Sequence, residues 1–316
     1  MILTLLVALV AARGANRSAT YDHTRCLTDK PASSSRALAW FIFLSPDVPR
    51  MDQIAREFAR SVESARYNTI GASFILAMPL TADKNSTLLA PILDTCRKYS
   101  VSIVTVPALG DLKLDSSVVQ AINKNNNCCK GQEYLKLYAW MFSDYDRVMM
   151  VDTDIIFLQN VDFLFSCPVP FLYTRGLMSP LNGGMIVLTP SDKDFEAMTT
   201  ILATPGVYDS KGFWNRTGYH LKKFLFHRKI HPHGIEGPQG FFYYYFVQRS
   251  ARGAQLDMCR FNFQGCATTA LKDVYIMHKM IPGDKRAPIL RNLTAKMSRV
   301  VSKAKPLRSR KEGIAD

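Results

Sequence analysis

Two carboxylates separated by one residue follow an apolar stretch near the middle of the chain. Residues 147–151 (RVMMV) are mostly apolar, and Asp152-Thr153-Asp154 comes directly after them. Side chains alternate along an extended strand, so Asp152 and Asp154 can point the same way and share one cation. Carboxylate oxygens bind hard divalent cations such as Mg²⁺ and Mn²⁺, which also take phosphate oxygens and water. Such a triplet is also common in solvated turns, so the preceding apolar stretch is the stronger part of the argument.

The segments on either side of the triplet predict how it is positioned. The apolar run 147–151 predicts a strand that is buried on both faces. Before it, residues 133–142 place Leu135, Tyr138, Ala139 and Phe142 at helical spacing, which predicts an amphipathic helix. In open α/β sheets, ligands bind at the carboxyl ends of the strands. The triplet therefore stands where a binding site is expected.

The first third of the chain alternates between strand and helix patterns. Strands are predicted at 37–44, 71–78 and 101–106, with helices at 51–65 and 88–99 between them. This alternation is typical of an α/β domain with a mostly parallel central sheet. No glycine-rich dinucleotide fingerprint follows the first strand, which argues against an NAD-type cofactor.

The charge of the chain is strongly basic. The 316 residues are 47% hydrophobic and carry a formal net charge of +14, which suits an anionic partner. Much of this excess lies in the tail 291–316, which we expect to be solvated and mobile, and through which alone we expect any membrane association. No nucleic-acid-binding module is recognisable, so we expect no nucleic-acid partner. The basic residues in this tail are Lys296, Arg299, Lys303, Lys305, Arg308, Arg310 and Lys311.

The N-terminus predicts entry into the secretory pathway. Residues 1–12 have the apolar character and length of a signal-peptide core, although a buried N-terminal strand or helix is the alternative. We expect residues 13–36 to form a polar leader or stem outside the core, and residues 37–290 to form the domain. Seven cysteines allow up to three disulfides, with the pairing left open. Four glycosylation sequons agree with secretion: Asn16, Asn85, Asn215 and Asn292.

Three later blocks offer further candidate site residues. Asn182-Gly183-Gly184 precedes an apolar strand, which indicates close backbone approach to a ligand or a neighbouring strand, or a turn before the strand. Gly237-Pro238-Gln239-Gly240 precedes the aromatic run 241–246, which we predict to be a buried helix. His278 ends a predicted strand, where a hydrogen-bonded structural histidine is the more common interpretation.

The residues around the triplet resemble the glycogenin-like retaining glycosyltransferases (family 8), which include galactinol synthases and plant glucuronosyltransferases of xylan. The resemblance covers roughly residues 37–290 and is strongest from 133 to 191. It implies a single Rossmann-like nucleotide-diphospho-sugar transferase domain of the GT-A type. It also implies that the triplet binds Mn²⁺, with Mg²⁺ as the alternative, together with a UDP-sugar diphosphate. The segments that carry it are 136–140, 145–148, 151–154 and 158–162.

The resemblance also implies roles for individual residues. The metal ligands would be Asp152, Asp154 and His278, and the catalytic residues Asp154, Lys136, Gln239 and Glu236. Glu236 is included because Pro238 stands where the family usually has an aspartate near the reacting sugar, so either Glu236 serves instead or activity is altered. The donor contacts would be Lys136, Asp152, Thr153, Asn182, Gly183, Gly184, Gln239, Gly283 and Lys285.

These features predict a metal-dependent retaining hexosyltransferase of the secretory pathway, in the Golgi lumen or secreted. It would move sugar from a UDP-sugar to a hydroxyl of a glycan, polyol, lipid or protein acceptor, as a monomer or a homodimer. One alternative is a non-catalytic UDP-sugar-binding or assembly subunit with the same fold. A second alternative is a basic protein that associates with nucleic acid or membranes through its tail.

Overall fold

The computed structural model describes the central part of the chain with several gaps. The described residues are 20–26, 35–42, 51–68, 70–79, 87–125, 130–176, 179–209, 213–214, 236–264, 266 and 269–278. The predicted signal peptide 1–12, the four sequons, the tail 291–316, Gly283 and Lys285 lie outside these residues. The domain boundary at residue 290 remains a prediction.

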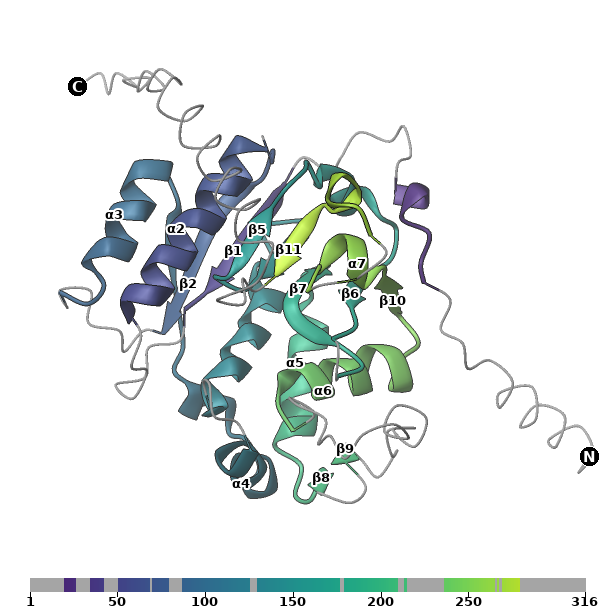
Figure 1. Ribbon diagram of the computed structural model, residues 1–316. Helices are drawn as coiled ribbons and strands as arrows, with labels where there is room; N and C mark the ends of the chain where they lie inside the picture. The colour runs from purple at the N-terminus through teal and green to yellow at the C-terminus, as the bar shows by residue number, and fades with distance from the viewer. Residues whose placement is uncertain are drawn as a thin grey trace, which may run out of the picture.

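A seven-stranded sheet with the order β10-β6-β7-β4-β1-β2-β3 forms the centre of the molecule (Figure 1). The strands β3, β2, β1 and β4 run parallel, as do β6 and β10, whereas β7 is antiparallel to both β4 and β6. The prediction of a mixed α/β domain with a mostly parallel sheet is therefore confirmed. The strands are β1 (Arg36–Phe41), β2 (Ser73–Pro79), β3 (Ser102–Val106), β4 (Arg147–Val151), β6 (Phe171–Thr174), β7 (Asn182–Leu188) and β10 (Gly253–Leu256).

Both faces of this sheet are covered, which explains why its central strands are apolar throughout. Along β1, Leu38 and Trp40 enter one core and Ala37, Ala39 and Phe41 enter the other. The first core lies under α2 (Met51–Tyr67) and α3 (Ala90–Tyr99), which pack side by side (Figure 1). The second lies against α4 (Ser116–Asn125), the 3₁₀-helix η3 (Lys130–Met141), α5 (Asp192–Leu202), α6 (Pro238–Phe242) and the π-helix η6 (Tyr243–Arg249).

The segment before the triplet differs from the expected amphipathic helix. It forms η3, in which every residue from Tyr134 to Trp140 is buried, because it passes between the sheet and the helices α4, α5 and α6. The helical spacing of its apolar residues correctly indicates a helix, but the face of η3 opposite these residues is buried as well. Lys136 is therefore buried in the protein instead of lying on an exposed helix face.

The aromatic run 241–246 lies across α6 and the start of η6 and, as predicted, is buried apart from the partly exposed Tyr243. Trp140 packs against two of its rings, with centroid distances of 5.0 Å to Phe242 and 5.4 Å to Phe246. Phe246 also stacks on Phe171 of β6 at 4.2 Å. These contacts fix the position of α6 against η3 and the sheet.

A small antiparallel sheet lies beside the end of β4. Its strands are β5 (Ile155–Phe157) and β11 (Ile276–His278), and His278 pairs with Ile155. Phe263, just after α7 (Met258–Phe261), bridges to Met277 on the other side of β11. The remaining described elements are η1 (His23–Cys26), η2 (Leu109–Leu112), η4 (Asp162–Ser166), β8 (Tyr208–Asp209), β9 (Phe213–Trp214) and η7 (Leu271–Asp273).

Two disulfides join described segments, Cys26–Cys167 and Cys259–Cys266, and Cys96 is a buried free thiol. The first disulfide corrects the expectation that all of residues 13–36 lie outside the core. Cys26 is 1% exposed within the core, and the His23 ring packs 5.2 Å from the ring of Phe261. Residues 20–26 are thus part of the domain. None of the described helices combines the length and the apolar character that crossing a membrane requires.

Candidate functional site

The site begins where β4 ends and the chain turns into β5. The backbone N–H of Asp152 donates to the carbonyl oxygen of Gly184 at 3.0 Å, which continues the pairing of β4 with β7. The turn through Thr153 then brings Asp154 directly before β5. Both aspartates are partly exposed, with side-chain exposures of 31% and 21%, so their carboxylates remain accessible to a ligand.

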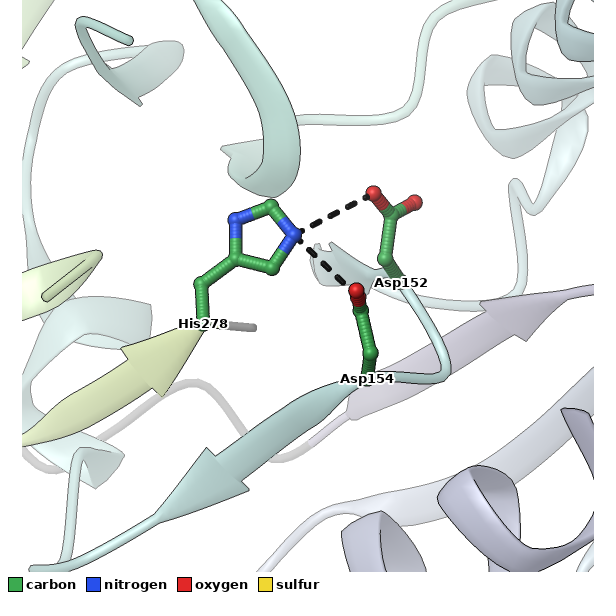
Figure 2. A group of neighbouring side chains, drawn as sticks. All are labelled: Asp152, Asp154 and His278. Carbon is green, nitrogen blue, oxygen red and sulfur yellow. Dashed lines mark ion pairs between the residues drawn. The ribbon is translucent and has the colours of Figure 1, made fainter. Parts of the chain in front are cut away.

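β11 brings His278 to face the two aspartates (Figure 2). Its Nε2 lies 3.1 Å from Oδ1 of Asp154 and 3.9 Å from Oδ2 of Asp152. One ligand atom from each of the three residues lies within 4.8 Å of the other two. Two carboxylate oxygens and an imidazole nitrogen at this spacing match the ligand types of a divalent cation site.

The contacts of the His278 ring fit a cation at this position. Nδ1 lies 2.8 Å from Oδ1 of Asn262, an oxygen that accepts when the Nδ1 proton is present. The amide nitrogen of Gln264 lies 3.1 Å from the same ring atom. With the proton on Nδ1, Nε2 presents a lone pair to the carboxylates, and in the described part of the chain it has no hydrogen-bond partner. A cation would relieve the repulsion among these atoms, so the residues fit a metal ion.

Lys136 places a positive charge next to the carboxylates. Its Nζ donates to Oδ1 of Asp152 at 2.6 Å and to the carbonyl oxygen of Gly183 at 3.3 Å, and its side chain is only 3% exposed. Burial acts to lower the pKa of Lys136, but the carboxylates of Asp152, Glu133 and Asp154 outweigh it and raise the pKa above its ordinary value. The site thus holds a fixed cation that could also face an anionic ligand.

The two glycines of β7 leave space for the side chains that pack against them, His278 at Gly184 and Gln239 and Lys136 at Gly183. A Cβ on Gly184 would lie 2.4 Å from Cε1 and 2.6 Å from Nδ1 of His278, so only glycine allows the ring its position. The side-chain Oδ1 of Asn182 accepts from the Gly184 N–H at 2.8 Å. The glycines lie within the strand itself and pack closely against the His278 side chain, while Asn182 makes the local side-chain bond expected of the alternative.

Of the two candidates around α6, one lies at the site. Cγ of Gln239 is 3.2 Å from where a Cβ on Gly183 would stand, which puts Gln239 beside Lys136. Glu236 is buried, and its backbone oxygen accepts from the Tyr134 hydroxyl at 3.0 Å. Burial, with a contribution from Glu236, raises the pKa of Tyr208 to about 12. The structure therefore does not group Glu236 with the metal-ligand candidates.

Two residues of the site carry no signal in the sequence. Asn262 contacts His278 and also donates from Nδ2 to Oγ1 of Thr174 at 2.8 Å, and both residues are 0% exposed. Neither belongs to a recognisable motif, and Thr174 lies 88 positions from Asn262 in the chain. Only the folded arrangement of β6, α7 and β11 brings them together.

Comparisons with known proteins find short matches to plant proteins that are named as glucuronosyltransferases. No family model matches the sequence. Over 65 residues the chain is 45% identical to PGSIP7 of Arabidopsis thaliana, which bears the name of a glucuronosyltransferase. Over 85 residues it is 38% identical to a protein of the same plant named as a UDP-glucuronate:xylan alpha-glucuronosyltransferase. These matches span 13% and 15% of the relatives' own lengths.

The fold has counterparts among solved structures. The chain superposes on LgtC, known from an active-site mutant, with a TM-score of 0.51 and 8% identity, covering 82% of this chain and 95% of LgtC. It is also similar to the glycosyltransferase GlyE of Streptococcus pneumoniae, with a TM-score of 0.49 over 85% of this chain and 64% of GlyE, at 11% identity. The superposition on LgtC confirms the GT-A type of fold, and the sequence matches to the plant proteins named as glucuronosyltransferases confirm the resemblance.

Proposed function

We propose that this chain, which shares its fold and part of its sequence with glycosyltransferases, transfers a hexosyl group from a UDP-sugar to an acceptor hydroxyl in a metal-dependent reaction. The observation that carries the proposal is the convergence of Asp152, Asp154 and His278 at the end of β4, with Lys136 beside them. In an α/β sheet this is the edge at which nucleotide ligands bind.

Asp152, Asp154 and His278 would hold the cation. Two carboxylates with an imidazole form a ligand set that suits Mn²⁺ better than Mg²⁺, which prefers oxygen ligands alone. When bound, such an ion acts as a Lewis acid on phosphate oxygens and neutralises charge on a departing diphosphate. The aspartates are positioned for this by the backbone bond between Asp152 and Gly184, and His278 by its pairing with Ile155.

The surrounding residues would bind and orient the donor. Lys136 is preorganised by burial and by its bond to Gly183, so its charge can stabilise the negative charge that develops on the diphosphate. Asn182 and Gln239, which lie beside Gly184 and Gly183 respectively, are the proposed contacts to sugar hydroxyls, and the two glycines are proposed as backbone contacts to the donor. Thr153 in the turn, with Gly283 and Lys285 beyond the described residues, completes the proposed donor contacts.

Retention of the anomeric configuration is proposed from the resemblance, with the acceptor hydroxyl attacking from the side of the leaving group. Pro238 begins α6 and offers no carboxylate to the reacting sugar. Glu236, two residues earlier, is buried at the start of this segment and is the proposed substitute for that carboxylate. The acceptor would be a glycan, polyol, lipid or protein.

The secretory pathway is the proposed location, in the Golgi lumen or outside the cell. Disulfides persist in oxidising compartments, and the two described here join segments of the folded domain. The apolar N-terminus and the four sequons agree with this proposal. Formation of a homodimer and contact of the basic tail with membranes remain proposals from sequence.

A non-catalytic subunit is the second candidate function. The specific observation in its favour is Pro238, which replaces an acidic residue at the family position nearest the reacting sugar. Such a protein would bind Mn²⁺ and UDP at the same residues but would not turn the donor over.

The two functions differ in a turnover assay. We would measure UDP release and sugar transfer from a panel of UDP-sugars with Mn²⁺ and candidate acceptors. Wild-type protein should turn over one donor preferentially, and Asp154→Asn should reduce the rate by at least about 10²-fold. Asp192→Asn, the same change at an exposed position of α5, is the matched control and should leave the rate unchanged. Binding of UDP without turnover of any donor would favour the non-catalytic subunit.

A further inference from the structure

The side chain of Asn262 is completely buried between the sheet and the candidate metal site. Its Oδ1 lies 2.8 Å from Nδ1 of His278, and its Nδ2 donates to Oγ1 of Thr174 at 2.8 Å. In this orientation the amide nitrogen faces Thr174 and the amide oxygen faces the imidazole. Asn262 itself contacts neither carboxylate, so its influence on a bound cation must pass through His278.

We propose that Asn262 is a positioning residue that fixes the tautomer of His278, and that the Cys259–Cys266 disulfide holds the segment on which Asn262 lies. This inference rests on the metal site of the proposed function. Groups that bind the second nitrogen of a metal-binding histidine orient the ring and raise the affinity for the ion. Here the buried amide of Asn262 orients His278. Because the Cys259–Cys266 disulfide holds the Asn262 segment, reduction of this disulfide would lower the affinity for the cation.

The alternative tautomer shows why the acceptor matters. Without an acceptor at Nδ1, the proton could reside on Nε2 instead. Oδ1 of Asp154 lies 3.1 Å from Nε2 and would accept that proton, so a hydrogen bond would occupy the place of the cation. By accepting from Nδ1, Asn262 keeps the lone pair of Nε2 directed at the carboxylates.

The backbone ties the Asn262 segment to the strand that carries His278. The N–H of Tyr275 donates to the carbonyl oxygen of Arg260 at 2.8 Å, and the N–H of Phe263 donates to that of Ile276 at 3.0 Å. The N–H of His278 itself donates to the carbonyl oxygen of Phe263 at 3.1 Å. The Cys259–Cys266 disulfide, with a sequence separation of 7, encloses this whole segment. Opening it would free the segment beyond Phe263 and with it the second amide, Gln264.

Metal affinity and tautomer can be measured without turnover. We would titrate Mn²⁺ by electron paramagnetic resonance into wild type, Asn262→Leu and Asn262→Asp. Asn262→Leu has a similar volume but no acceptor, and its Mn²⁺ affinity should fall about 10–100-fold. Asn262→Asp keeps an acceptor for Nδ1–H and should retain wild-type affinity or exceed it. A purely structural role would instead make the affinity of both variants follow their stability.

A matched control removes a different amide that supports the same small sheet. Nε2 of Gln159 donates to the carbonyl oxygens of Lys272 at 2.8 Å and Val274 at 2.9 Å, without contacting His278. Gln159→Met should therefore reduce stability but leave Mn²⁺ affinity unchanged. In metal-free protein, ¹⁵N spectra of histidine should show the His278 proton on Nδ1 in wild type and Asn262→Asp, and on Nε2 in Asn262→Leu.

The two disulfides provide the redox test. Cys259→Ser/Cys266→Ser should lower Mn²⁺ affinity about 10-fold, the lower end of the range for outer residues. Cys26→Ser/Cys167→Ser removes a link across 141 positions, so it should reduce stability more but leave Mn²⁺ affinity unchanged. Equal affinity in both double variants would overturn the role of the Cys259–Cys266 disulfide.

The outcomes separate this inference from the proposed function. Wild-type protein that fails to bind Mn²⁺ would overturn both the metal-dependent function and the inference. Mn²⁺ binding by wild type with no loss in Asn262→Leu, or an Nε2 proton in wild type, would overturn only the inference. If Asn262→Leu does not fold, Asn262→Asp and the Cys259→Ser/Cys266→Ser variant still decide it, since reduced affinity in Asn262→Asp contradicts the acceptor role.

Discussion

At the scale of single residues, the candidate site depends on the absence of a side chain as much as on its ligands. The His278 ring occupies the space beside Gly184 in which any other residue would place its Cβ. The neighbouring atoms are a buried ring and Oδ1 of Asn182, which lies 2.8 Å from the same point. These groups are packed against the sheet, so they cannot yield easily.

This packing predicts the effect of one added methyl group. Gly184→Ala should displace the His278 ring from the aspartates and lower Mn²⁺ affinity about 10-fold or more, as measured by titration. Gly110→Ala is the control, because a Cβ there would meet nothing within 4 Å. Wild-type affinity in Gly184→Ala would show that His278 is not a ligand at the position seen here.

Removing the charge of Lys136 should affect Mn²⁺ affinity and the rate of sugar transfer differently. Its Nζ now occupies one oxygen of Asp152, and its charge repels a divalent cation. Lys136→Met should therefore leave Mn²⁺ affinity unchanged or increase it. The same variant should lower the rate of sugar transfer about 10²–10³-fold, because the charge that stabilises the diphosphate is lost. A parallel loss of both quantities would indicate that Lys136 only supports the fold.

At the scale of elements, the apolar strands could be predicted from sequence and the enclosed segment could not. β4 was predicted at its observed bounds, Arg147–Val151, because a continuous apolar run ended by two aspartates has few other interpretations. The spacing in η3 predicts an amphipathic helix, because spacing reveals the first buried face but not whether the second face is covered too. That depends on helices far away in the sequence.

Some residues of the candidate site could be predicted from the sequence and others could not. Asp152 and Asp154 could be predicted from two carboxylates at the end of an apolar run, and His278 from the resemblance, and the structure brings the three together. Asn262 could not, since an isolated asparagine has no pattern and its two contacts lie 16 and 88 positions away. The sequence also does not determine the disulfide pairing, because seven cysteines permit many combinations.

The contact between α5 and the segment after η6 gives a prediction at this scale. Asp194 accepts from both terminal nitrogens of Arg252, at 2.6 and 3.1 Å, and from the Tyr245 hydroxyl at 2.9 Å. Burial acts to raise the pKa of Asp194, but the bonds from Arg252 and Tyr245 outweigh it and lower the pKa below its ordinary value of 3.8. The ionised carboxylate thus stabilises the fold at neutral pH.

Asp194→Asn should reduce the free energy of unfolding at pH 7 by about 1–3 kcal/mol. Because the pKa of Asp194 is lowered on folding, this stabilisation is complete above the ordinary pKa and is lost as the pH falls through the lower folded value. Denaturant unfolding at pH 7, 5 and 3 should show a constant difference between wild type and variant at pH 7 and 5 that begins to shrink at pH 3. A difference that grows on acidification would contradict the assignment.

At the scale of the whole molecule, the site unites four segments that are far apart in the chain. Lys136 comes from η3, the aspartates from the turn after β4, the glycines from β7, and His278 from β11. Two cores, one on each face of the sheet, hold these segments at one edge of it. A nucleotide diphosphate bound there would meet a cation and Lys136 together, so its affinity should depend on the metal.

The most direct measurement is therefore UDP binding by calorimetry, with Mn²⁺ and with EDTA, in wild type and Asp154→Asn. We predict that wild type binds UDP with Mn²⁺ at least about 10-fold more tightly than with EDTA, as expected when a cation joins protein and phosphate. In Asp154→Asn this dependence should disappear. UDP binding that is equally tight in EDTA and in the variant would contradict a metal site made of Asp152, Asp154 and His278.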